Sequence, residues 1–133
     1  MADTQPVISI VDDDPSVRRA LSRLVRLAGY IVESFASARE FLASAPRGRP
    51  ACLVLDIHLN KGEMSGFELQ QRLVADGVAI PTIVITAHGD ARMRERVKQS
   101  GVAGFLSKPF GDQVLLNLIQ KGNLSGLTCR SLN

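Results

Sequence analysis

The chain has 133 residues, of which 45% are hydrophobic and 22% are charged, and its formal net charge is +3. This length suits one domain that folds without disulfides or a structural metal, and this composition excludes a disordered or fibrous protein. The basic residues are scattered and accompany no nucleic-acid motif, so they predict only a weak attraction to anions. No apolar run approaches the roughly 18 residues of a membrane span, and the N-terminus has no signal-peptide pattern. We therefore expect a soluble, cytoplasmic protein with no membrane partner.

Short apolar runs alternate with segments of helical periodicity along the chain. The runs are VISIV (7–11), YIVESF (30–35), CLVL (52–55), TIVIT (82–86) and GFLS (104–107). Runs of this length are typical of strands that are buried on both faces, and their alternation with helices predicts an α/β domain with a parallel sheet. The run at 30–35 is the least continuous, which favours an edge position for that strand.

The helix predicted between the first two runs has the clearest pattern. Asp14 can cap it, Pro15 suits its first position and Gly29 suits its end. One side carries an apolar stripe that should face the core: Val17, Leu21, Leu24, Val25 and Ala28. The other side should be covered by polar residues: Arg18, Arg19, Ser22, Arg23 and Arg26. We therefore expect an amphipathic helix that packs on the sheet through the first set.

Four further helical segments follow. Capping boxes predict the starts of the second and third helices: Ser37-x-x-Glu40 and Ser65-x-x-Glu68. The fourth helix, over about 90–100, is rich in Arg and has only Met93 and Val97 as sizeable apolar residues, so it is thinly anchored. The fifth, over 112–121, should turn three apolar residues inward: Leu115, Leu118 and Ile119. Residues 122–133 show no periodicity, so we expect one domain over 1–121 and a C-terminal tail without a domain of its own.

Polar residues with chemical potential stand directly at the ends of the apolar runs. They are Asp12, Asp13 and Asp14 after the first run, Asp56 after the third, Thr86 closing the fourth and Lys108 after the fifth. In an open parallel sheet, sites form outside the carboxyl ends of the strands, so these side chains should share one edge. Crowded carboxylates repel one another unless a cation lies between them. Asp12, Asp13 and Asp56, with the main-chain carbonyl two residues beyond Asp56, fit the oxygen ligands that Mg²⁺ prefers.

Lys108 and Thr86 make the acidic cluster more specific. Lys108 precedes Pro109, which favours an extended backbone, and its amine can serve as a counter-charge or bind a phosphoryl oxygen. Thr86 adds a hydroxyl donor. A nucleophilic carboxylate, a metal and two donors are the groups that phosphoryl transfer uses. The alternative is that the acids are solvated loop residues and that the Thr and the Lys-Pro pair are only structural. Each residue taken alone would favour this alternative, but their combination does not.

Four short motifs occur in a fixed order at these strand ends. The order IVDDD–VLD–VITA–SKPF resembles the receiver domain of bacterial two-component response regulators over about residues 6–121. The segments IVDDDPSVR, ESFASAREFL and LSKPF are most similar to the FixJ-type subfamily. The resemblance implies a CheY-like, flavodoxin-like (βα)5 three-layer sandwich with a parallel five-stranded sheet of order 2-1-3-4-5.

The resemblance also implies a phosphoacceptor and its metal site. Asp56 would accept a phosphoryl group from a sensor histidine kinase or a histidine phosphotransfer protein. Asp56, Asp13 and the main-chain carbonyl of His58 would be Mg²⁺ ligands, and Asp12 would bind the ion through water. The expected chain is therefore a signalling domain with slow autodephosphorylation, and not an enzyme that acts on a separate substrate.

A switch follows from the same resemblance. Lys108 would pair with the phosphate, and Thr86 would turn towards it while Phe105, at the aromatic switch position, moves inward. The face formed by the fourth helix, fifth strand and fifth helix would then control an output domain or protein partner, or form a homodimer. Direct DNA binding is not expected of this chain, because only twelve residues follow Lys121.

The loop after Asp56 departs from the family pattern D-x-x-x-P-G-x-x-G. The interval from Asp56 to Gly66 is two residues longer, and Asn60 stands where the proline is expected. This predicts a less rigid loop around the carbonyl ligand. The fourth helix is also unusually basic for a surface on which receivers dimerise or meet their output partner.

Three other functions share parts of this pattern. A haloacid dehalogenase-type phosphatase also uses a nucleophilic Asp, Mg²⁺, Thr and Lys, but it requires a second Asp where this chain has His58. A flavodoxin-like FMN carrier would supply hydroxyls and amides after the first strand in place of acids. A degenerate receiver that no longer takes phosphate is the third, and the presence of all five signature side chains disfavours it.

The chain has two histidines, and both should flank the mouth of the site. His58 lies two residues after Asp56, and His88 lies two residues after Thr86. Either one alone fits a solvent-exposed loop residue without a role. Imidazole titrates near neutrality, so together they could tune the lifetime of the acyl phosphate between about pH 6 and 8.

Overall fold

The computed structural model describes residues 6–44, 50–56, 64–77, 80–86, 92, 95, 104–107 and 110–121. Within these residues, all strands pair in parallel in a single sheet of order β2-β1-β3-β4-β5. The strands are β1 (Val7–Val11), β2 (Ile31–Phe35), β3 (Cys52–Asp56), β4 (Thr82–Thr86) and β5 (Gly104–Ser107). The flavodoxin-like sheet order and the edge position of β2 are confirmed. Because every strand runs in the same direction, their carboxyl ends share one edge.

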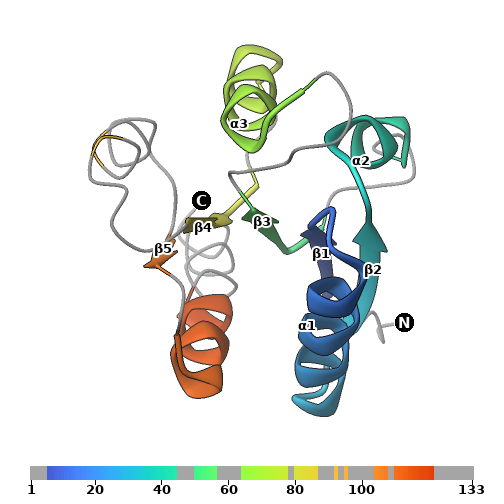
Figure 1. The fold of residues 1–133 in the computed structure, drawn as a ribbon, viewed down its shortest axis with the longest axis vertical. Helices are drawn as coiled ribbons and strands as arrows, with labels where there is room; N and C mark the ends of the chain where they lie inside the picture. The colour runs from blue at the N-terminus through green and yellow to red at the C-terminus, as the bar shows by residue number, and fades with distance from the viewer. Residues whose placement is uncertain are drawn as a thin grey trace, which may run out of the picture.

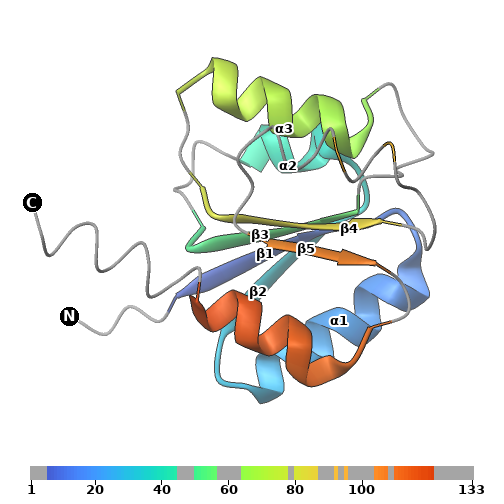
Figure 2. The same cartoon turned by 90° about the vertical axis from the view of Figure 1, so that its left-hand side faces the viewer.

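Helices cover both faces of this sheet. They are α1 (Pro15–Leu27), α2 (Ala38–Ser44), α3 (Gly66–Ala75) and the helix of residues 112–121. Figure 1 views these layers along the sheet, and Figure 2 shows α2 and α3 on one face, with α1 and the helix of residues 112–121 on the other. The predicted fourth helix lies outside the described residues except for Arg92 and Glu95, which are helical and exposed. No helix in the described ranges is both long and apolar enough to cross a bilayer.

Alternate residues of the central strands feed two apolar layers. On the α1 side, Ile8 and Ile10 of β1 pack with helix residues such as Val25 and Leu115. On the other side lie Val11, Leu53 and Leu55, with the residues that α2 and α3 contribute: Phe41, Leu69 and Leu73. The predicted inward residues of helix 112–121 are confirmed, since Leu115 and Ile119 are fully buried and Leu118 packs against the same layer. The strands are thus buried on both faces, as their continuous apolar runs predicted.

The start and end of α1 agree with the sequence signals. Asp14 is the N-cap, and its Oδ1 accepts hydrogen bonds from the N–H groups of Ser16 at 2.8 Å and Val17 at 3.4 Å. Pro15 occupies the first helical position. Gly29 follows the helix with φ +103°, a left-handed conformation that glycine adopts without strain. The helix therefore begins directly at the acidic loop after β1.

Two expectations for the faces of α1 were wrong. Ala28 is exposed because it is the C-cap residue, where the chain already leaves the sheet. Ser22 is only 5% exposed, although it was placed on the polar side. Its hydroxyl donates to the carbonyl of Arg18 at 2.7 Å, and this bond within the helix lets a small polar side chain be buried.

The two predicted capping boxes differ in detail. At α3, the Glu68 N–H donates to Ser65 Oγ at 3.1 Å and the Ser65 N–H donates to Glu68 Oε1 at 2.8 Å, which is the full reciprocal pair. At α2, the Glu40 N–H donates to Ser37 Oγ at 3.1 Å, but Glu40 Oε1 accepts from the N–H of Ala36 at 3.2 Å. In the α2 box, the Glu40 side chain therefore bonds to a main-chain N–H one residue further back than the sequence pattern predicts.

Gly104 fixes how closely the last described helix packs on the sheet. A Cβ atom at this position would lie 3.3 Å from the Cδ atoms of Leu118 and 3.4 Å from Ile83 Cγ1. The absence of a side chain therefore lets Leu118 lie directly on β5. This contact packs the C-terminal half of the helix of residues 112–121 on the amino end of β5.

Candidate functional site

Three carboxylates meet at the carboxyl edge of the sheet. β1 and β3 are neighbours, and Val11 is paired with Leu55, so the next residues, Asp12 and Asp56, end up side by side. Asp13 follows in the loop after β1. Each of the three acids offers an oxygen, and these atoms all lie within 4.8 Å of one another. The predicted juxtaposition of Asp12, Asp13 and Asp56 is confirmed.

The loop that presents these acids is held by hydrogen bonds at Asp12 and Asp14. The Asp12 N–H donates to the carbonyl of Phe35 at 3.1 Å, which extends the β1–β2 ladder to the edge. Asp12 Oδ1 accepts from the N–H of Asp14 at 2.9 Å, and this bond turns the chain towards α1. Asp14 itself caps the helix. Of the three consecutive acids, the helix therefore uses Asp14, while Asp12 and Asp13 face Asp56.

Arg18 is a supporting residue that sequence reasoning missed. It was expected on the polar, solvent-facing side of the first helix. Instead it is partly buried, and its Nη1 donates to the carbonyl of Asp12 at 2.8 Å. The bond ties the second turn of α1 back to the acidic loop. An arginine within two turns of an N-cap that follows an acidic strand end is the signal that could have indicated it.

Burial makes the carboxylate cluster energetically expensive. Asp12 is 1% exposed and Asp56 is 6% exposed, while Asp13 is intermediate. Two unit charges about 4–5 Å apart repel by roughly 3–4 kcal/mol at an effective dielectric constant of about 20. A cation bound among the three would convert this repulsion into attraction. A set of carboxylate oxygens suits a hard divalent ion such as Mg²⁺, so the donor chemistry fits the ion that the sequence predicted.

Thr86 lies beside this cluster at the end of β4. Asp56 is paired with Ile85, so Thr86 is one residue further towards the edge on the adjacent strand. Its side chain is fully buried, and within the described part of the chain its Oγ1 has no hydrogen-bond partner. A buried hydroxyl without a partner costs about 1–3 kcal/mol. Such a group is suited to a ligand oxygen that arrives at the edge.

Phe105 is positioned by the neighbouring strand. It is paired with Val84 in the β4–β5 ladder, two residues before the Thr86–Ser107 pair. Its ring is partly buried. Lys108, His58 and His88 lie outside the described residues, so the counter-charge, the carbonyl ligand and the two tuning histidines stay predictions.

Comparison with known proteins decides the family. The model of the response regulator receiver domain matches residues 8–120, which is most of the chain. The chain belongs to this family. As a receiver domain of a two-component response regulator, it is a signalling domain with the fold that its sheet order already indicated.

Similar sequences come from several bacteria. The chain is 43% identical over 118 residues to Nodulation protein W of Bradyrhizobium diazoefficiens, covering 89% of this chain and 51% of that protein. It is 42% identical over 120 residues to the response regulator protein TodT of Pseudomonas putida (90% of this chain, 52% of that protein). Transcriptional regulatory protein FixJ of Rhizobium meliloti is 38% identical over 120 residues (90% and 58%). The chain spans about half the length of the curated relatives it matches.

Solved structures agree with this assignment. The crystal structure of FixJ-N superposes with a TM-score of 0.82 at 37% identity, covering 90% of this chain and 94% of that one. The response regulator StyR superposes with a TM-score of 0.84 at 42% identity, covering 97% of this chain and 64% of that one. The receiver domain thus has the fold expected of its FixJ-like relatives.

Proposed function

We propose that this receiver domain accepts a phosphoryl group on Asp56 and passes the change to an output partner. The observation that carries the proposal is the meeting of Asp56 with Asp12 and Asp13 beside the buried, unpartnered Thr86 hydroxyl. Only Asp56 among the three acids ends a central strand. The other two come from the loop after β1, where Asp12 is fixed by its main-chain bonds.

The chemistry needs one nucleophilic oxygen. A carboxylate oxygen of Asp56 attacks the phosphorus of a phosphohistidine, the P–N bond breaks, and the freed imidazole takes up a proton. With a small donor such as acetyl phosphate, the P–O bond breaks and acetate leaves. Mg²⁺, when bound by Asp12, Asp13 and Asp56, would neutralise charge on the phosphoryl oxygens. Asp12 and Asp13 hold the cation site, and Lys108 supplies a second positive charge.

The output step follows from the unpaired hydroxyl of Thr86. A phosphoryl oxygen on Asp56 offers this hydroxyl an acceptor, so Thr86 turns towards it. The space that the side chain leaves on β4 lies next to β5, where Phe105 can move inward. The face beyond these residues then changes shape and contacts the output domain or protein.

The relatives support a phosphorelay context. A sensor histidine kinase or histidine phosphotransfer protein would be the phosphodonor. FixJ of Rhizobium meliloti is named a transcriptional regulatory protein, which supports a transcriptional output for the protein that contains this domain. DNA contacts would then belong to another part of that protein or to its partner.

The test is intact-mass analysis after incubation with acetyl phosphate, with Mg²⁺ or with EDTA. The parent should gain one phosphoryl mass only with Mg²⁺, and Asp56→Asn should gain none. Asp14→Asn is the matched control, because it changes an acid of the same site region while asparagine still caps α1. Equal modification of the parent and Asp56→Asn, with both folded by circular dichroism, would assign the acceptor to another residue.

A further inference from the structure

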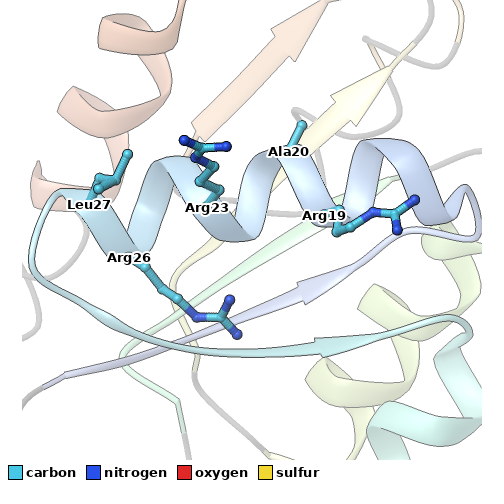
Figure 3. A pocket seen from close by; sticks show the side chains of 5 residues that line it. All are labelled: Arg19, Ala20, Arg23, Arg26 and Leu27. Atoms are coloured by element: carbon cyan, nitrogen blue, oxygen red, sulfur yellow. The ribbon is translucent and has the colours of Figure 1, made fainter.

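Arg18 differs from the other arginines of α1 in the position of its side chain. The others are exposed, and with two apolar residues they line an open depression along the helix (Figure 3): Arg19, Arg23 and Arg26 with Ala20 and Leu27. Arg18 is partly buried, and its Nη1 donates to the carbonyl of Asp12 at 2.8 Å. This carbonyl precedes the N-cap of the helix, so the bond joins α1 to the acidic loop and not one helical turn to the next.

Asp12 is held in place from three directions. Its N–H donates to the carbonyl of Phe35 at 3.1 Å, and its Oδ1 accepts from the N–H of Asp14 at 2.9 Å. The third bond is the one from Arg18 to its carbonyl. The first two bonds are made by main-chain groups or by a proposed cation ligand, so no substitution removes them alone. The bond from Arg18 comes from a side chain outside the loop, and it can be removed without changing an acid.

The backbone from which the Arg18 side chain extends is itself fixed. Its N–H donates to the carbonyl of Asp14 at 2.9 Å, and its carbonyl accepts from the hydroxyl of Ser22 at 2.7 Å. Ser22 is 5% exposed, so this part of the helix lies against the rest of the domain. A planar guanidinium that extends from a fixed backbone keeps its donors directed with little further loss of conformational freedom. The acidic loop is therefore tied to a rigid part of the molecule.

The Arg18 side chain has two opposite effects on a cation at the acidic cluster. Because the guanidinium contacts the main chain of Asp12, its positive charge lies near the cluster and would lower the affinity for Mg²⁺ by repulsion. Its hydrogen bond, however, fixes the loop that carries two of the three acids. Outer groups that orient metal ligands change metal affinity by about 10–100-fold. The sign of the net effect therefore separates a role as a charge from a role as a support.

We propose that Arg18 is a positioning residue, which holds Asp12 and Asp13 where their oxygens meet Asp56 and thereby raises the affinity for Mg²⁺ despite its own charge. The proposal rests on the Mg²⁺ site of the proposed function and adds a residue that does not touch the ion. Without the bond from Arg18, the loop of residues 12–14 must be ordered when the ion binds. The cost of that ordering is subtracted from the free energy of binding.

Calorimetric titration of the full chain with Mg²⁺, without a phosphodonor, measures this affinity. Arg18→Met has a side chain of similar length without the charge or the donors, and it should weaken Mg²⁺ binding by about tenfold. Arg18→Gln is a milder change and should act in the same direction, and Arg18→Lys should restore part of the affinity because it keeps a donor. Arg19→Met is the matched control, because it removes the same charge from the next, exposed position. At an ionic strength of about 0.15 M, which screens exposed charges, its affinity should stay within about twofold of the parent.

Amide hydrogen exchange in EDTA measures the order of the loop in the absence of the ion. The Asp14 N–H bonds to Asp12 Oδ1, so its exchange reports on the position of that carboxylate. It should exchange several times faster in Arg18→Met than in the parent, and Arg19→Met should leave it unchanged.

Tighter Mg²⁺ binding by Arg18→Met would make Arg18 a counter-charge to the acids and would overturn the proposal. An affinity equal to that of the parent, with a lower melting temperature in both EDTA and Mg²⁺, would make it a contact that only stabilises the fold and would overturn the proposal as well. A parent that binds no Mg²⁺ would reject the cation site of the proposed function, and this inference with it. A failure confined to the Arg18 variants leaves that site standing.

Discussion

The polar side chains at the two ends of β3 and β4 lie in opposite kinds of environment. At the amino ends, Cys52 is fully buried as a free thiol, and the Thr82 hydroxyl donates to the carbonyl of Ile80 at 2.9 Å. At the carboxyl ends, Asp56 lies among other acids, and the Thr86 hydroxyl has no partner among the described residues. The same strands thus have one end where every polar group is neutral or bonded, and one end where charge and an unused hydroxyl are retained. On these two strands, stability is given up at the end where a ligand is expected.

The largest change in stability should come from a substitution inside β3, between the two strand ends. Leu53 is fully buried between the sheet and the α2–α3 layer. Leu53→Ala should lower the free energy of unfolding by about 2–5 kcal/mol, because it loses apolar contacts and leaves a cavity. Urea denaturation measures the change. Val74→Ala on the exposed side of α3 is the control and should stay within about 0.5 kcal/mol of the parent.

Cys52 gives the amino end a dependence on alkaline pH. Burial raises the pKa of its thiol from 9.0 to about 12, with a smaller opposing effect from a hydrogen bond to the Leu53 backbone. The folded state therefore keeps a proton that the unfolded state releases, so the contribution of Cys52 to stability is complete below pH 9 and is lost as pH rises towards 12. The slope approaches about 1.4 kcal/mol per pH unit in that range.

Denaturation of the parent and Cys52→Ala at several pH values isolates this effect. The variant should be less stable at pH 8, and the difference should shrink by about 2 kcal/mol between pH 9 and 10.5. A constant difference over that range would mean that the thiol does not titrate as its burial requires.

At the carboxyl end, replacing either of two neighbouring acids should change the free energy of unfolding in opposite directions. Asp13→Ala removes one of three crowded charges, so in EDTA it should raise the free energy of unfolding by about 1–2 kcal/mol. Asp14→Ala removes the helix cap and should lower it by about 1 kcal/mol. Thermal melting with EDTA and with added Mg²⁺ tests both, because Asp13→Ala should also weaken stabilisation by the ion. An unchanged Mg²⁺ response would remove Asp13 from the ligand set.

The smallest difference separates the two threonines of β4. Thr86→Val replaces an unpartnered buried hydroxyl with a methyl group of similar size and should stabilise the free domain by about 1 kcal/mol. Thr82→Val loses a hydrogen bond and should destabilise it by a similar amount. Thr86→Val should still take phosphate from acetyl phosphate but show a smaller change in amide exchange across residues 104–107. A full change there would assign the relay to another side chain.

Much of this contrast between strand ends could be read from the sequence. Each apolar run became a strand, with the third extending to Asp56 and the second starting at Ile31. The position of Asp12, Asp56 and Thr86 at one edge follows from parallel strands alone. The strand order does not, because apolar runs carry no information on which strands are neighbours, and it came from the resemblance.

The details that escaped prediction depend on single hydrogen bonds. Ser22 is buried because its hydroxyl finds the Arg18 carbonyl, and Arg18 supports the acidic loop because its guanidinium reaches the Asp12 carbonyl. Glu40 caps one residue further back than the pattern indicates. Periodicity assigns a residue to a side of a helix, but it does not reveal where a long or small polar side chain finds its partner.

The acidic cluster exists only when β1 and β3 are paired. Asp12 and Asp56 come from strands that are neighbours in the sheet but are separated in the chain by α1, β2 and α2. An unfolded or partly folded molecule therefore has an isolated Asp56 with neither cation ligands nor the Thr86 hydroxyl beside it. Such a molecule should not react with a phosphodonor, so the fraction of chains that can be phosphorylated would equal the fraction that is folded. Phosphorylation would then be restricted to folded molecules, and a misfolded molecule could not transmit a signal.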